Sequence, residues 1–182
     1  MTKRWFGYGL LAVFASQFLL VGGMLFDRLQ TLRNGQEVIL SSRFVDPRDL
    51  FRGHYVILNL SVGDVMVSLP GGNRDYGYND PIFVGLKEQE DGFWEAAQLA
   101  DSAEKITGMP VLKATYRGKS GDRLRISLPF DRYFAPKKRA QELEKFRQDS
   151  KLGVVIALNE EGGGVIKGVT IDGEIVYDEP LL

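Results

Sequence analysis

Residues 5–26 form the longest uncharged stretch of this 182-residue chain, and only Ser16 and Gln17 interrupt its apolar character. As a helix, these 22 residues would be about 33 Å long at about 1.5 Å per residue, which is enough to cross a hydrocarbon core of about 30 Å. The sequence therefore predicts a single transmembrane helix that contacts the lipid bilayer through residues 5–26.

The charges beside this stretch set the expected orientation. Lys3 and Arg4 precede it, and no charged residue follows until Asp27. Because basic residues stay on the cytoplasmic side, we expect the amino terminus in the cytoplasm and the rest of the chain outside it. We therefore divide the chain into residues 1–32, which comprise the cytoplasmic terminus, the anchor and its helical extension, and residues 33–182, an extracytoplasmic domain.

A cleavable signal peptide is the competing interpretation. Its apolar region is normally about 7–15 residues long and ends in a small-x-small cleavage site. The stretch here is longer, and its best cleavage site, residues 21–23, precedes the apolar residues 24–26 instead of following them. The uncleaved anchor is therefore the favoured hypothesis, and a secreted periplasmic ligand-binding domain, released after Gly23, remains an alternative.

Composition excludes several functional classes. The chain contains no cysteine, so it has no disulfide, no thiolate metal site and no cysteine nucleophile. Its one histidine, His54, excludes metal sites built from several histidines. The net charge of −1 argues against a general nucleic-acid-binding protein, which needs a basic surface. We expect no cofactor and no metal centre, and the oligomeric state stays open.

The part of the chain after the anchor is dominated by short stretches rich in β-branched and aromatic residues. Turn residues separate them, such as Asp91-Gly92 and Asp172-Gly173. One stretch, residues 54–60, is apolar at both odd and even positions and is expected to be a central strand. The expected strands cover residues 37–44, 54–60, 81–86, 93–99, 111–116, 123–128, 153–158, 165–171 and 174–177.

One helix interrupts these strands in the prediction. Pro136 is suited to a first helical turn, and residues 137–148 are mostly good helix formers with a narrow apolar stripe. The sequence thus predicts a mainly β domain, either a β-sandwich or a partly open barrel, mostly antiparallel, with one short helix. A single transmembrane helix precedes this domain.

A distinctive turn joins the first two expected strands. Asp46 is placed to cap a helical turn that Pro47 begins, and Asp49 offers a second carboxylate to the exposed backbone amides. Gly53 ends the turn where a left-handed conformation is expected. We predict that this turn is a structural staple, with a binding or catalytic site as the alternative.

The same segment carries a family resemblance. The chain resembles the GDYXXLXY family of bacterial membrane-anchored proteins in its lead-in, in residues 53–60 and in a later landmark at residues 132–136. The motif positions that we take as candidate site residues are Asp46, Pro47, Arg48, Asp49, Arg52, Gly53, His54, Tyr55, Leu58, Tyr133, Phe134 and Pro136.

The resemblance implies a cellular location and a fold, and it supplies no mechanism. It implies a protein of the bacterial inner membrane with a β-rich periplasmic domain, and it implies no enzymatic activity. The chain departs from the family pattern at His54, where the motif has aspartate, at Leu60, where it has tyrosine, and at Lys137, where the family tends to carry glutamate. We therefore expect a non-catalytic accessory protein whose partners are multi-spanning membrane proteins.

Two enzymatic alternatives depend on the same segment. Asp46, Asp49 and His54 would supply acid–base groups to an envelope hydrolase, because imidazole titrates near neutral pH. A serine–lysine dyad like that of type I signal peptidases is not expected, since Phe44 stands where their nucleophilic serine would be.

The loop over residues 71–80 is the other polar candidate. Its oxygen-bearing side chains suit Ca²⁺ by type, but their spacing misses the EF-hand pattern, so a polar surface loop is expected. Three nearby aromatic residues, Tyr76, Tyr78 and Phe83, would form a contact patch for a partner or a glycan, with packing at strand ends as the alternative.

Overall fold

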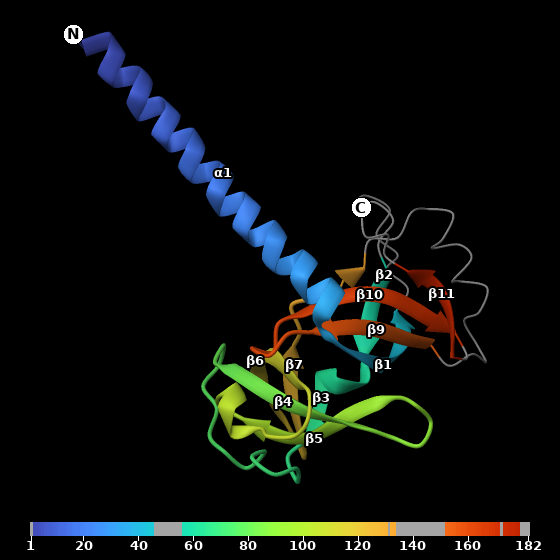
Figure 1. Ribbon diagram of the computed structural model, residues 1–182. Helices are drawn as coiled ribbons and strands as arrows, with labels where there is room; N and C mark the ends of the chain where they lie inside the picture. The colour runs from blue at the N-terminus through green and yellow to red at the C-terminus, as the bar shows by residue number, and fades with distance from the viewer. Residues whose placement is uncertain (1, 46–55, 131, 134–151, 172, 179–182) are drawn as a thin grey trace.

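A computed structural model describes residues 2–45, 56–130, 132–133, 152–171 and 173–178 (Figure 1). Helix α1 (Thr2–Asn34) projects away from a β domain and is the one α-helix among these residues. The stretch Tyr8–Asn34 is long and apolar enough to cross a membrane, and its most apolar window is fully exposed. Such a helix is compatible with a single-pass anchor and with a signal sequence.

Eleven strands of the described residues form one open, mixed sheet with the order β11-β10-β9-β1-β5-β4-β6-β7-β3. Strand β2 pairs with β1 beside this path, and β8 pairs with β2. The strands are β1 (Gln36–Val45), β2 (Val56–Leu60), β3 (Asp64–Met66), β4 (Pro81–Glu88), β5 (Trp94–Ala100), β6 (Val111–Ser120), β7 (Arg123–Ser127), β8 (Arg132–Tyr133), β9 (Leu152–Leu158), β10 (Gly164–Ile171) and β11 (Glu174–Asp178).

All nine expected strands are present, and the expected mainly antiparallel β architecture is confirmed. Among the described strands, the one parallel pairing joins β1 to β5 at Leu40 and Trp94. Strand β2 has a neighbour on each side, as the central-strand prediction requires, but it lies off the main order of the sheet. The predicted helix over residues 137–148 lies outside the described residues.

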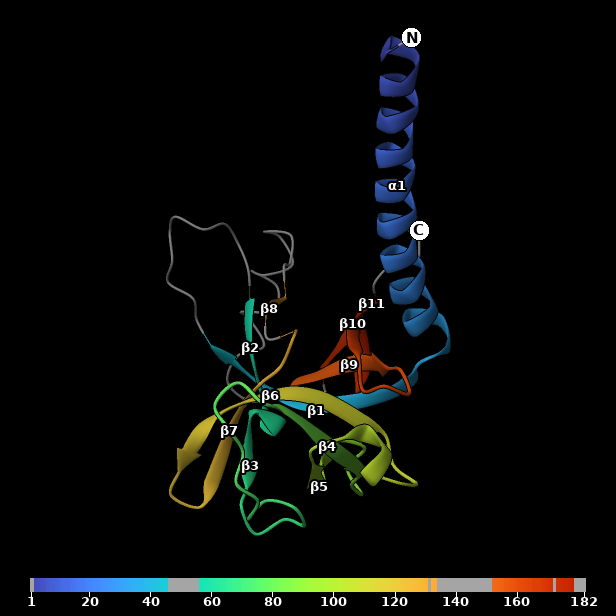
Figure 2. The ribbon, with the colours of Figure 1, turned by 90° about the vertical axis from the view of Figure 1, so that its left-hand side faces the viewer.

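The two halves of the sheet share one hydrophobic core. Strand β1 contributes Val38 and Leu40, which are fully buried, while Ile82 and Leu112 come from β4 and β6 in the other half. Strand β7 shows the period-two alternation expected from its sequence, with Leu124 buried between two exposed arginines. The open sheet therefore curls around its core, as Figure 2 shows from the side.

Strand β9 is buried at every position. One of its faces contributes Val154 and Ile156 to the shared core. The last turns of α1 contact β9 and β10, and both Thr31 and Leu32 of α1 are buried. A strand covered on both faces carries apolar residues without alternation, which explains the unbroken apolar sequence here.

Gly35 ends α1 for a reason that its sequence context alone did not indicate. Its backbone N–H donates to the Thr31 carbonyl at 2.9 Å, so the helix closes on this residue. A Cβ at Gly35 would collide with the Thr31 carbonyl oxygen and would lie 2.9 Å from that of Leu158. Glycine is needed here because helix and strand backbones approach closely, and not because of a positive φ angle.

Glycines also form the hairpin turns that the sequence predicts. Gly92 joins β4 to β5 at a φ of 79°, and Gly121 joins β6 to β7 at a φ of 62°. The left-handed region is costly for residues with a Cβ, which explains why glycine occupies these turns. Gly118 is close to this turn in sequence, but it lies at a bulge within β6.

Candidate functional site

The described strands next to the two family landmarks, β2 and β8, lie side by side at one end of the sheet. Strand β2 begins directly after residues 46–55 and pairs with β8, so that Val56 lies opposite Tyr133 and Ile57 lies opposite Arg132. Because the pairing is antiparallel, the chain enters β2 and leaves β8 at the same end of the pair. Segments far apart in the sequence therefore meet here.

Two further strand ends lie at the same place. Val45, the last residue of β1, pairs with Ile57. Ser42 of β1 pairs with Leu60 on one side and with Leu152, the first residue of β9, on the other. The strands thus bring both ends of residues 46–55 and both ends of residues 134–151 to one region, which we call the motif end.

Most candidate site residues lie outside the described residues. These are Asp46, Pro47, Arg48, Asp49, Arg52, Gly53, His54, Tyr55, Phe134 and Pro136. The structural staple and the acid–base cluster therefore stay predictions. The backbone positions of Leu58 and Tyr133 are described, within β2 and β8.

Comparison with known proteins bears on the same segments. Residues 17–169 match the sequence profile of the GDYXXLXY protein family, which covers most of the chain. The chain belongs to the GDYXXLXY family. No curated protein and no solved structure matches it. In this GDYXXLXY protein, the pairing of β2 with β8 brings the described parts of two distant landmarks, residues 56–60 and 132–133, into one structural region.

Ser42 is the polar side chain of the motif end whose surroundings are described. It is 7% exposed, and its hydroxyl has no hydrogen-bond partner among the described residues. A buried hydroxyl without a partner is unfavourable, so Ser42 is held there by the strands on both sides. The sequence places Ser42 on the wrong side of the turn for a nucleophile, and it gives no signal that this serine is buried.

A second region lies where α1 meets the domain. A groove of about 830 Å³ lies between the last turns of α1, the segment around the 3-10 helix η2 (Ala103–Lys105) and the turn between β9 and β10. Its lining has four carboxylates and no lysine or arginine; the acidic residues are Asp27, Glu104, Glu160 and Glu161. Sequence reasoning missed this groove because three separate segments build it.

The polar loop before β4 is tied to β6. The Asn79 side-chain oxygen accepts a hydrogen bond from Arg117, and the Asp80 carboxylate accepts one from the Gly77 N–H at 2.9 Å. Asn79 has a φ of 72°, the one positive value at a non-glycine residue in the described part of the chain. Two of the oxygen-bearing side chains considered for Ca²⁺ thus have partners within the protein.

The expected aromatic patch divides into two parts. Tyr76 is buried, its hydroxyl donates to the Gly71 carbonyl at 2.9 Å, and its ring centroid lies 5.8 Å from that of Tyr116. Burial raises the pKa of Tyr76. Tyr78 is 70% exposed, with the Arg117 guanidinium 6.0 Å from its ring centroid, whereas Phe83 is half-buried. Tyr78 is therefore the member of the patch that reaches solvent.

Asp101 links this loop to the segment before β6. Its carboxylate lies 2.6 Å from Arg74 and 2.7 Å from Lys105. The hydrogen bond from Lys105, with the charge of Arg74 in addition, lowers the pKa of Asp101. These contacts are local and partly exposed, and they fasten the loop to its neighbour without forming a reactive group.

Proposed function

We propose that this protein is a membrane-anchored accessory protein whose β domain binds a neighbouring multi-spanning membrane protein and catalyses no reaction. The observation that carries the proposal is the junction of α1 with the sheet, which we call the joint: Thr31, Leu32, Gly35 and the faces of β9 and β10 that α1 contacts. A packed joint fixes where the domain lies relative to its helix.

The joint lies close to the expected edge of the bilayer. If residues 5–26 span the membrane, Thr31 follows the last spanning residue by five positions, or about 7.5 Å of helix. The acidic groove, which includes Asp27 of α1, then lies at the level of the lipid headgroups. This is the height at which loops of multi-spanning proteins leave the membrane, so the groove is positioned to contact them.

The proposed location is the bacterial inner membrane, with the amino terminus in the cytoplasm and the domain in the periplasm. Lys3 and Arg4 support this orientation through the positive-inside rule. Because the natural chain has no cysteine, single-cysteine variants report topology directly. In intact spheroplasts, a membrane-impermeant maleimide should label Ser120→Cys and should leave Thr2→Cys unlabelled until the membrane is opened. The reverse pattern would contradict the orientation.

Photo-crosslinking in native membranes tests the accessory role. Gln30 and Asn34 line the groove and are exposed, so a photoreactive amino acid at either position should give a discrete adduct with an integral membrane protein. Glu88, at the tip of the β4–β5 hairpin, is a matched control position that should not give the same adduct. Adducts with lipid alone at both groove positions would contradict the proposal.

An envelope hydrolase that uses Asp46, Asp49 and His54 is the second candidate. The convergence of strand ends at the motif end supports it, because the convergence brings both landmarks of the sequence to one region. His54→Ala separates the two proposals. Loss of the cellular role with an unchanged melting temperature would favour the hydrolase, while an intact cellular role would favour the accessory protein.

A further inference from the structure

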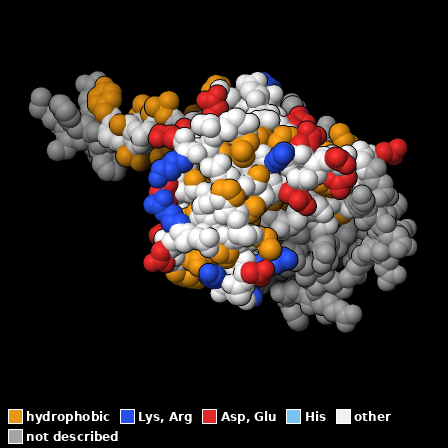
Figure 3. All heavy atoms as spheres, turned by 90° about the horizontal axis from the view of Figure 1, so that it is seen from below, with side chains coloured by type: hydrophobic (Ala, Val, Ile, Leu, Met, Phe, Trp, Pro, Cys, Tyr) orange, Lys and Arg blue, Asp and Glu red, His pale blue; other side chains and the backbone are white. Residues whose placement is uncertain are grey.

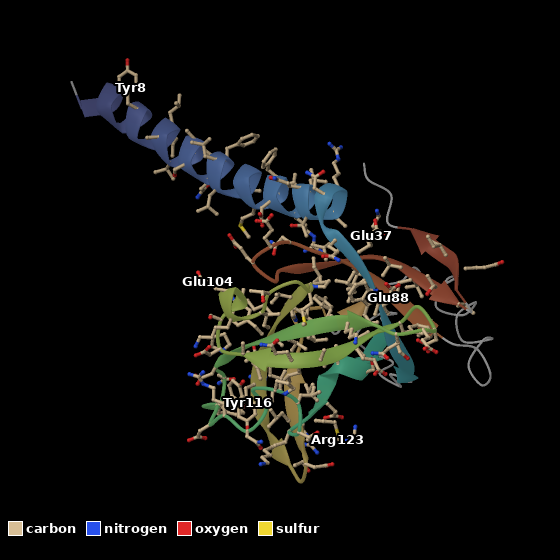
Figure 4. All side chains as sticks on the ribbon, turned by 60° about the horizontal axis from the view of Figure 1, so that its bottom comes forward. Tyr8, Glu37, Glu88, Glu104, Tyr116 and Arg123 are labelled. Carbon is tan, nitrogen blue, oxygen red and sulfur yellow. The ribbon has the colours of Figure 1, made fainter. Side chains whose placement is uncertain are left out.

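The domain carries a second exposed surface at the end opposite α1. Figures 1 and 2 both show the β6–β7 hairpin on the side away from the helix, and Figure 4 shows Arg123 at the opposite end from Tyr8. On the face seen from below, basic side chains lie among hydrophobic and acidic ones (Figure 3). We define the distal surface as the exposed side chains of Met66, Tyr78, Arg117, Arg123 and Arg125.

The cations of the β6–β7 hairpin form no ion pair with any described residue. Residues 117–125 contain four basic residues and one acidic residue, Asp122, which gives this stretch a net charge of +3. Within the described part of the chain, none of the four basic residues forms an ion pair, although Asp64 lies opposite Arg125 in the β3–β7 register. By contrast, Lys105 is paired with Asp101, and Lys167 is paired with Glu37.

Two of the arginines lie beside exposed apolar side chains. Arg123 lies opposite Met66, which is 40% exposed, and Arg117 lies beside Tyr78, which is 70% exposed. Protein interfaces are enriched in arginine, tyrosine and methionine, and tyrosine and arginine are frequent hot spots. A partner that used charge alone would gain nothing from the exposed ring and thioether, so this composition favours a protein partner over an anionic polymer.

The loop that presents Tyr78 is preorganised. The Asn79 N–H donates to the Tyr116 carbonyl at 3.0 Å, and the Tyr116 N–H donates to the Asp80 carbonyl at 2.9 Å, so both residues after Tyr78 are tied to β6. Asn79 is held in the left-handed region, where non-glycine residues are uncommon. A side chain held in place before binding loses less conformational entropy when a partner docks.

We propose that the distal surface docks an extended acidic segment of a protein partner. Arg123 and Arg125 flank the buried Leu124, so they leave the same face of β7, about 6.7 Å apart along the strand. Carboxylates at alternate positions of an extended peptide have the same spacing, which allows each arginine to pair with one carboxylate. The acidic groove of a second copy in the same membrane is not this partner, because it lies at the headgroup level.

Fluorescence anisotropy tests this docking with the full chain in nanodiscs of phosphatidylcholine. The probe is a short labelled peptide that alternates glutamate with leucine and tyrosine. Long-chain polyphosphate, which offers negative charge but no apolar group, is added to compete with the peptide. Reversing both arginines, in R123E/R125E, should weaken peptide binding by about tenfold or more. Met66→Ser combined with Tyr78→Ser should weaken it severalfold without any change of charge, whereas Lys87→Glu, an exposed cation on β4, should leave it within about twofold.

Three results would overturn the proposal. The first is that the wild-type chain does not bind the peptide. The second is that R123E/R125E binds the peptide as the wild type does, with an unaltered melting temperature. The third is that polyphosphate competes with the peptide while the Met66 and Tyr78 changes have no effect on binding. The last result would identify a surface for polyanions. The proposal goes beyond the accessory role at the joint, and the groove crosslinks from Gln30 and Asn34 test that role independently.

Discussion

The joint and the distal surface are two regions of the same domain that are built in opposite ways. The joint is closed by packing: Thr31 and Leu32 are buried, and the backbones of α1 and β9 nearly touch at Gly35. The distal surface is open, and Arg123 and Arg125 project from a strand whose other face holds Leu124 in the core. The acidic groove lies beside the first region. The second combines exposed Met66 and Tyr78 with arginines that form no ion pair among the described residues.

The difference in packing indicates that the joint contributes to stability and the distal surface to binding. Tight packing at the joint fixes the position of the domain relative to α1, while charged side chains on a rigid hairpin can be changed without affecting the core. Substitutions at the joint should therefore change stability, and substitutions at the distal surface should change binding.

The largest effect on stability is expected from Gly35→Ala. The added Cβ would meet backbone oxygens of Thr31 and Leu158, which cannot rotate away, so unfolding should become easier by about 3 kcal/mol. Thermal unfolding of the full chain in detergent micelles measures this loss. The control is Gly63→Ala, whose Cβ would meet nothing closer than the Ile126 carbonyl oxygen at 4.0 Å. Equal melting temperatures for both variants would show that the joint is not tightly packed.

A smaller loss is expected from Leu32→Ala. Leu32 is 8% exposed, and truncating it removes buried apolar contact at the joint, which should destabilise the domain by about 2 kcal/mol. Leu25→Ala is the matched control, because Leu25 is 50% exposed on α1 outside the joint. If both variants have the melting temperature of the wild type, the helix does not stabilise the domain.

At the distal hairpin, Gly121→Ala should cost about 1 kcal/mol, because its φ of 62° is unfavourable for a residue with a Cβ. No heavy atom lies within 4 Å of the added Cβ, so the effect comes from the backbone alone. Chemical denaturation is the appropriate measurement for so small a change. A loss as large as that of Gly35→Ala would contradict the view that the turn at Gly121 has free space around it, unlike the close-packed joint.

The smallest effect concerns Asp101 and depends on pH. The pKa of Asp101 is lowered in the folded protein, so its ion pairs stabilise the fold above its ordinary pKa near 3.8, and this contribution disappears as the pH falls through the lowered value. Asp101→Asn should therefore lower the melting temperature slightly at pH 6 and not at all in strong acid. Glu88→Gln controls for the loss of one exposed charge. A difference between wild type and Asp101→Asn that persists in strong acid would contradict the assignment.

The sequence predicted the strands well because each long strand carries its own pattern. The arginines of β7 alternate with Leu124 and Ile126, and glycine marks the turns at Gly92 and Gly121. Strands β3 and β8 escaped prediction because three or two residues carry no periodicity. Their pairing depends on neighbours that are distant in sequence.

Contacts between residues that are distant in sequence were also missing from the predictions of the candidate sites. The sequence singled out Tyr78, but it could not show that Tyr76 is buried or that Arg117 lies beside the exposed ring. The acidic groove was missed because its carboxylates are separated along the chain. The close approach at Gly35 was likewise invisible, since an Asn-Gly pair after a helix indicates an ordinary helix end.

Depth-dependent fluorescence quenching tests most directly whether the joint lies at the membrane and the distal surface away from it. A fluorophore would be attached to Glu160→Cys, beside the groove, or to Ser120→Cys, at the tip of the β6–β7 hairpin, in vesicles that contain headgroup spin-labelled lipid. We expect strong quenching at residue 160 and little at residue 120. Equal quenching at both positions, or stronger quenching at residue 120, would contradict a domain held at the bilayer by its joint.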